Sequence, residues 1–168
     1  MWREGQAVTS SIVIRGGFEA AHRLPQLGEA CASVHGHSWR LTVTVTAPVL
    51  SPDGTVAEFG AFKRAVRAWT DAHWDNGAML GIADPLLQAF TADGSKTFRF
   101  GAGQDASDAE QFAHDQAWPT VEAVAIVIAR VAGSLLAAIP RAPGAGVISV
   151  LVDETRANSA AWTCGDGS

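Results

Sequence analysis

Apolar and polar positions alternate along two stretches near the start of the chain. The first runs from Ser11 to Ala21, and the second, over 36–47, alternates apolar with hydroxyl side chains and ends before Pro48. A period of two with many β-branched residues is typical of a strand that buries one face. We therefore expect two strands here, with the glycine pair at 16–17 bending the first one.

Two later stretches follow a helical period instead. Apolar residues recur at intervals of three and four from Phe59 to His73, whereas the segment from Thr120 to Ala138 is apolar almost all round. The first pattern predicts an amphipathic helix, and the second predicts a buried helix that begins after a proline. The remaining expected elements are a short helix after Asp84-Pro85 and strands near 96–101, 147–152 and 160–163.

This order of elements predicts an α+β domain. The chain has 168 residues, no internal repeat and no evident linker, so we expect a single domain over 1–168. The stretch 102–117 is polar, acidic and rich in glycine and alanine. We interpret it as an insertion loop and expect it to be mobile.

Composition narrows the class of protein. Hydrophobic residues make up 48% of the chain, and the net charge is −5 with lysine and arginine scattered. Scattered cations argue against a nucleic-acid partner, which needs a clustered basic face. No apolar run suits a membrane span or a signal peptide, so we expect no membrane partner. Two distant cysteines make no disulfide framework, and the expected compartment is the reducing cytoplasm.

Three of the five histidines fall within sixteen positions, and they flank a cysteine. His35 and His37 stand at the start of the second expected strand, where residues two apart share a face, and His22 ends the first strand. Three imidazoles with an open fourth position are typical of a catalytic zinc site. Cys31 could be a fourth ligand, a nucleophile or a base. Each histidine could equally be a structural strand residue.

Five short motifs follow one another in the order found in one known family. They are F-E-A-A-H-R-L at 18–24 with C-A-S-V-H-G-H-S-W at 31–39, G-T-V-A-E-F at 54–59 with Lys63, W-D-N at 74–76, P-T-V-E at 119–122, and V-D-E-T at 152–155. On these residues the chain resembles the 6-pyruvoyl-tetrahydropterin synthase and 6-carboxy-tetrahydropterin synthase family, over most of its length.

The resemblance implies a particular fold and assembly. The family's T-fold has a four-stranded antiparallel sheet with two helices packed on one face. Because an open sheet has two bare edges, sheets from several subunits close into a barrel. The chain is thus expected to form a homo-oligomer, a trimer or a hexamer, with active sites at subunit boundaries.

The resemblance also implies a zinc-dependent lyase that acts on 7,8-dihydroneopterin triphosphate or a related pterin. The 6-carboxy-5,6,7,8-tetrahydropterin synthase reaction, on the route to queuosine and other deazapurines, is favoured because Cys31 stands in a compact C-x-x-x-H-G-H motif. The alternatives are the 6-pyruvoyl-tetrahydropterin synthase reaction and that of a divergent pterin lyase or aldolase.

Individual residues take their expected roles from the same resemblance. His22, His35 and His37 match the family's Zn²⁺ ligands, and Cys31 matches its catalytic cysteine. A thiolate there would abstract and return a proton. Alternatively, Cys31 has no catalytic role and is a small buried apolar residue of the core.

The substrate is expected to contact four further residues. Glu154 matches the residue that anchors the pterin, since one carboxylate can accept both N–H donors of the pterin edge. Thr120, Glu122 and Thr155 are the other expected contacts. A glutamate in the first turn of a helix is also favoured by the helix dipole without any function.

One position departs from the family. An Asp-His pair there shuttles a proton to and from the cysteine, whereas here Asp75 is followed by Asn76. An amide cannot act as a general base near neutral pH. His73, one helical turn back, or His114 could supply the imidazole, although the helical pattern also suits His73 as a packed residue. A non-catalytic pterin-binding protein is therefore the alternative of another class, and a structural barrel without ligand is a third.

Overall fold

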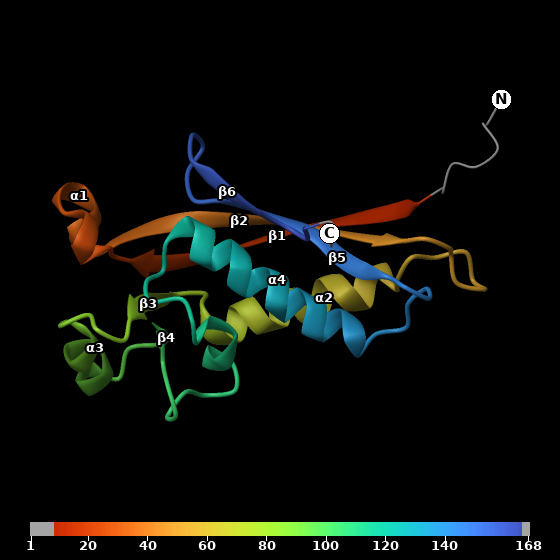
Figure 1. Ribbon diagram of the computed structural model, residues 1–168. Coiled ribbons are helices and arrows are strands. Elements are labelled where there is room, and N and C mark those ends of the chain that lie inside the picture. Colours follow the sequence, from red (N-terminus) through yellow and green to blue (C-terminus); the bar gives the residue numbers. More distant parts are fainter. Residues whose placement is uncertain (1–8, 166–168) are drawn as a thin grey trace.

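A six-stranded sheet forms the centre of the computed structural model, which describes residues 9–165 (Figure 1). β1 (Ser10–His22) and β2 (His35–Ala47) are its longest strands and pair antiparallel over their whole length. β5 (Gly146–Asp153) pairs antiparallel with β2, and β6 (Ser159–Thr163) pairs antiparallel with β5. These four strands lie close to the ranges that the alternation predicts.

Two short strands extend the sheet on the other side of β1. β3 (Gly77–Gly81) runs parallel to the end of β1, and β4 (Thr97–Phe100) runs parallel to β3. The sheet order is β4-β3-β1-β2-β5-β6, so the expected four-stranded antiparallel sheet is wrong in strand number and in direction. β3 is buried on both faces and therefore has no alternating pattern to reveal it.

The expected pair of long helices covers one face of this sheet. α2 (Phe59–His73) packs on β1, and α4 (Val121–Ala137) packs on β5 and β6 (Figure 1). Each begins at a side-chain cap: the Glu58 carboxylate accepts the N–H groups at 60 and 61, and Thr120 Oγ1 accepts one from Ala123. The α+β class with two helices on one face is confirmed.

The connections carry short helices. η1 (Pro25–Leu27) and α1 (Glu29–Ala32) lie between β1 and β2, at one end of the long sheet, and α3 (Leu87–Asp93) lies between β3 and β4 (Figure 1). Within residues 9–165, no helix has the length and apolar character needed to cross a membrane.

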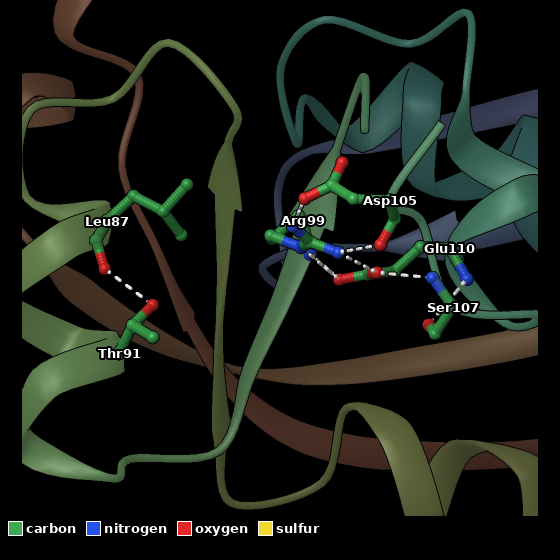
Figure 2. Close-up of polar contacts among 6 residues, drawn as sticks. All are labelled: Leu87, Thr91, Arg99, Asp105, Ser107 and Glu110. Carbon is green, nitrogen blue, oxygen red and sulfur yellow. Dashed lines mark hydrogen bonds and ion pairs between the residues drawn. The ribbon is translucent and has the colours of Figure 1, made fainter. Parts of the chain in front are cut away.

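The polar stretch 102–117 has more structure than its composition indicates. It contains η2 (Glu110–Ala113), and Arg99 of β4 reaches into it (Figure 2). The Glu110 carboxylate accepts hydrogen bonds from Arg99 Nε at 2.9 Å and Nη2 at 2.8 Å, and from the Ser107 N–H at 2.9 Å. Asp105 accepts a third bond from the guanidinium at 2.6 Å. We name these four residues the arginine clamp.

Charge pairing completes the anchoring of this stretch. Burial alone would raise the pKa of Glu110, but the hydrogen bonds from Arg99 and Ser107 lower it to about 2. Farther along, Asp115 accepts two bonds from Arg130 of α4, at 2.5 and 2.8 Å. The segment is thus tied to a strand and to a helix. Its status as an insertion stays a prediction.

Candidate metal centre

Three imidazoles meet where β1 ends and β2 begins. His22 lies directly opposite His35 in the antiparallel register, and His37 lies opposite Ala20. Their ring centroids are 4.7, 5.2 and 4.9 Å apart, and one nitrogen of each lies within 4.8 Å of the others. The three side chains share the sheet face of the buried Trp39. The structure therefore brings the expected histidines together.

Backbone carbonyls orient two of these rings. His22 Nδ1 lies 2.9 Å from the Pro119 carbonyl oxygen, and His35 Nδ1 lies 2.8 Å from that of Ser33. A carbonyl only accepts, so Nδ1 carries the hydrogen in both rings and a neutral ring keeps its lone pair on Nε2. Such a bond to the other ring nitrogen is what fixes a histidine ligand in metal sites.

The donor set fits a metal ion. His22 is 1% exposed, and among the described residues its Nε2 has no hydrogen-bond partner. Burial lowers the pKa of His22 to about 4 despite the bond to Pro119, and the two neighbouring imidazoles add to this effect. Neutral imidazoles are the form that binds metal, and three of them suit zinc-like ions.

A carboxylate lies beside the imidazoles. Glu154, directly after β5, places Oε1 3.4 Å from His22 Nε2 and 4.0 Å from His37 Nε2. Burial lowers the pKa of His37, and this negative neighbour acts against that shift. Sequence analysis did not indicate that Glu154 approaches the histidines or that Pro119 orients one of them. The only available signal was that both residues lie in matched motifs.

Cys31 lies in α1, between the strands that carry the histidines, and is half-buried. In the part of the chain that the structure describes, its sulfur does not join the group of ligand atoms formed by the three imidazoles. Its backbone carbonyl accepts the Leu24 N–H at 2.6 Å, which holds the β1–β2 connection. Its roles as a fourth ligand and as a catalytic residue both stay predictions.

Asp75 and Asn76 form the turn between α2 and β3. Asn76 has a φ of 55°, a left-handed conformation that asparagine tolerates better than most residues. The Asp75 carboxylate accepts the Glu19 N–H and the Asn76 side-chain amide, both at 2.8 Å. The Asp75 side chain therefore fixes the turn against β1, together with the Asn76 backbone N–H, which donates to the Glu19 carbonyl at 2.6 Å. Asn76 and His37 also line one open hollow of about 400 Å³.

Neither alternative imidazole lies in the histidine group. The His73 ring packs against that of Trp69 in a tilted arrangement with ring centroids 4.9 Å apart, and burial and the nearby Lys96 lower the pKa of His73. His114 is exposed, and its Nδ1 donates to the Gln111 carbonyl within η2 at 2.9 Å. The structure thus gives His73 a packing role, and its part in proton transfer stays a prediction.

A second hollow, of about 710 Å³, opens beside the carboxylate. Glu154, Thr155, His37, Arg40 and Arg156 are among the residues that line it. Thr155 Oγ1 accepts N–H bonds at 3.2 and 3.0 Å from two residues of the β5–β6 turn. This hydroxyl therefore holds the turn that follows the carboxylate.

The other two expected substrate contacts lie at the start of α4. Thr120 caps this helix, and Glu122 is exposed in its first turn. The neighbouring Pro119 carbonyl is the group of this motif that reaches the histidines. Substrate roles for Thr120 and Glu122 stay predictions.

Comparison with known sequences supports one family. The family described as "6-pyruvoyl tetrahydropterin synthase" matches residues 11–164. A protein of Halobacterium salinarum described as "Probable 6-carboxy-5,6,7,8-tetrahydropterin synthase" is 29% identical over 85% of this chain and 79% of its own length. The 6-carboxy-5,6,7,8-tetrahydropterin synthase of Rickettsia typhi is 33% identical over 38% of this chain, and the match spans only 46% of that relative.

Solved structures with the same fold belong to proteins of low sequence identity. The 6-pyruvoyl tetrahydropterin synthase of Caenorhabditis elegans superposes with a TM-score of 0.61 at 18% identity, over 98% of this chain and all of the other. That of Plasmodium falciparum gives 0.62 at 12% identity, over 92% and 96%. At these identities the likeness concerns the fold.

Proposed function

Because the chain belongs to the 6-pyruvoyl tetrahydropterin synthase family, we propose that it is a zinc-dependent lyase acting on 7,8-dihydroneopterin triphosphate or a closely related pterin. The favoured reaction is that of a 6-carboxy-5,6,7,8-tetrahydropterin synthase, the name that its curated relatives carry. The proposal depends on one observation above all: three imidazoles meet around a buried nitrogen, His22 Nε2, that has no partner among the described residues.

His22, His35 and His37 would hold the ion. A zinc ion at such a site acts as a Lewis acid and a template, acidifying groups on the oxygen-bearing side chain of the substrate. The carbonyls of Pro119 and Ser33 keep two of the rings in the tautomer that metal binding needs.

The hollow beside Glu154 is the proposed substrate pocket. One carboxylate of Glu154 accepts the two N–H donors of the pterin edge, while Thr155 holds the turn in place. Arg40 and Arg156 line the same hollow, and neither belongs to an ion pair among residues 9–165. Two such cations suit the phosphate groups of the substrate.

Proton transfer is assigned to Cys31, whose thiolate abstracts a proton from the substrate side chain and returns it. Asp75 and Asn76 orient neighbouring groups, since an amide cannot carry the proton. His73 remains the candidate for a substitute base. Its contact with Trp69 makes it a packed side chain that would have to move to act.

The protein is proposed to work as a homo-oligomer, a trimer or a hexamer, in the cytoplasm. β1 pairs with β3 only over its last residues, 20–22, and so Ser10–Glu19 has no partner strand on that side within the described chain. Bare strand edges favour pairing with another copy.

A non-catalytic pterin-binding protein is the competing function, and Asn76 is the observation that favours it. Incubation of the zinc-loaded protein with dihydroneopterin triphosphate, followed by mass analysis of the pterins, separates the two. Formation of 6-carboxytetrahydropterin that is lost in Cys31→Ala supports the lyase. Unchanged substrate that stays bound to the protein overturns it.

Asn76→His adds a second arm to this experiment. Histidine also tolerates the left-handed conformation at this position, so the variant keeps the turn. An inactive wild type made active by Asn76→His would favour the binding protein as the present state of the chain. Equal activity in both forms would show that the reaction proceeds without an imidazole at this position.

A further inference from the structure

Glu154 lies closer to the imidazoles than a substrate anchor requires. Its Oε1 atom is 3.4 Å from His22 Nε2 and 4.0 Å from His37 Nε2, and its side chain is 17% exposed. The contact joins the residue after β5 to the last residue of β1, which lie on either side of β2 in the sheet. The carboxylate therefore lies beside two of the three imidazoles, although it does not belong to the group whose ligand atoms all lie within 4.8 Å of one another.

The atoms that face each other are both electron-pair donors. His22 gives its ring hydrogen to the Pro119 carbonyl, so Nε2 of the neutral ring offers only a lone pair. A carboxylate oxygen likewise only accepts. Nε2 accordingly has no hydrogen-bond partner among the described residues, although Oε1 is its neighbour. Two facing acceptors, one of them buried and the other only partly exposed, are unfavourable unless a cation lies between them.

The separation has a simple geometric explanation. Two ligands that each lie about 2.0–2.2 Å from a tetrahedral zinc ion are about 3.4 Å apart. The observed 3.4 Å between Nε2 and Oε1 equals that spacing, and it is longer than a good N–H···O hydrogen bond.

We propose that Glu154 is the fourth ligand of the ion held by His22, His35 and His37 while no substrate is bound. With four protein ligands the site is closed. A second step rests on the proposed function. When substrate binds, the Glu154 carboxylate would leave the ion to accept the N–H donors of the pterin edge, and this would free a coordination position for the substrate.

The backbone around Glu154 allows this exchange through the side chain alone. Its N–H donates to the Asn158 carbonyl at 3.1 Å, and Thr155 makes the next two contacts of the turn. The turn is thus held by its own hydrogen bonds, while the carboxylate accepts no hydrogen bond from the described residues and also lines the neighbouring hollow.

Zinc affinity tests the proposal without any turnover. Metal-free wild type, Glu154→Gln and Glu154→Ala are titrated with Zn²⁺ against a chromophoric chelator. Asp53→Asn, in an exposed turn, is the control for the loss of one charge. We expect both Glu154 variants to bind zinc at least tenfold more weakly and Asp53→Asn to match wild type. Equal affinity in all four proteins overturns the proposal, as does a wild type that binds no zinc.

Cobalt substitution reports the coordination directly. The visible spectrum of the Co²⁺ protein is expected to change in Glu154→Gln, and addition of neopterin is expected to shift the wild-type spectrum while leaving that of the variant almost unchanged. Identical spectra for the two proteins overturn the proposal. If zinc affinity depends on Glu154 but no product forms, only the lyase function is contradicted. If product forms and zinc affinity is unaltered in Glu154→Gln, only the assignment of Glu154 as fourth ligand is contradicted.

Discussion

The histidine group and the arginine clamp each contain one buried polar residue, and these two residues, His22 and Glu110, differ in their hydrogen bonding. In the clamp, Glu110 is 6% exposed, and both of its carboxylate oxygens accept bonds from Arg99 and Ser107 (Figure 2). In the histidine group, His22 is 1% exposed, and among the described residues its Nε2 has no partner.

The difference lies in whether the buried polar atoms of each cluster have hydrogen-bond partners. An unsatisfied buried polar atom costs about 1–3 kcal/mol, whereas a fully bonded one stabilises the fold. Sequence analysis singled out the histidines, which match a motif, and gave the clamp residues no role. The structure adds that Glu110 is fully hydrogen-bonded within the clamp, whereas His22 Nε2 has no partner among the described residues.

The largest expected effect comes from removing one imidazole. His22→Ala should abolish zinc binding and the proposed lyase activity. Wild type should gain about 2.7 kcal/mol of stability at free zinc about one hundred times the Kd, and the variant should gain nothing. Thermal unfolding with and without zinc measures this. His114→Ala, at an exposed histidine outside the group, should keep the full zinc effect. A zinc effect in His22→Ala would contradict the assignment.

Breaking the arginine clamp should lower stability without touching the metal site. Glu110→Gln leaves Arg99 facing a neutral amide, and removing one partner of a buried pair costs about 3 kcal/mol. Urea denaturation measures the loss, with Asp108→Asn, at an exposed position of the same stretch, as control. Zinc affinity should stay at the wild-type value. A combined loss of zinc affinity and stability would show that the clusters are coupled.

Acid should weaken the clamp in a defined pH window. The pKa of Glu110 is lowered from 4.5 to about 2, so the folded state favours the charged carboxylate. Its contribution to stability is complete above pH 4.5 and disappears as the pH falls toward 2. The stability difference between wild type and Glu110→Gln, followed by denaturant titration from pH 6 downward, should therefore shrink over that range. A difference that stays constant would contradict the charged pair.

The smallest expected effect concerns the turn at Asn76. Its left-handed φ of 55° costs a residue with a Cβ about 1 kcal/mol, which glycine avoids. Asn76→Ala should therefore be less stable than Asn76→Gly by about 1 kcal/mol in urea denaturation. The side-chain bond to Asp75 is lost in both variants and cancels in this comparison, so equal stabilities would contradict the cost of the left-handed conformation.

Local patterns predicted the long elements well. The spacing of apolar residues gave the bounds of α2 (Phe59–His73), and the alternation placed β1 and β2 to within a residue. It also placed His35 and His37 on one face, because that follows from strand geometry alone. The antiparallel pairing that adds His22 follows from two neighbouring strands joined by a short connection.

Contacts between residues far apart in the sequence could not be predicted from such local patterns. β3 pairs in parallel and is buried on both faces, so the sequence shows neither an alternating pattern nor a short hairpin turn that would predict this strand. The contact between His22 and Pro119 spans 97 positions, and Glu154 reaches the same ring from the far side of β2. The pairing of Arg99 with Glu110 gave the stretch 102–117 an order that its polar composition hides.

Metal content tests most directly the claim that the histidine group is a ligand site. The protein would be purified without added metal, dialysed against excess zinc and then against buffer, and analysed by inductively coupled plasma mass spectrometry. We predict about one zinc ion per chain in wild type and none in the triple variant that replaces His22, His35 and His37 by alanine. Wild-type protein that retains no more zinc than the triple variant would contradict the assignment.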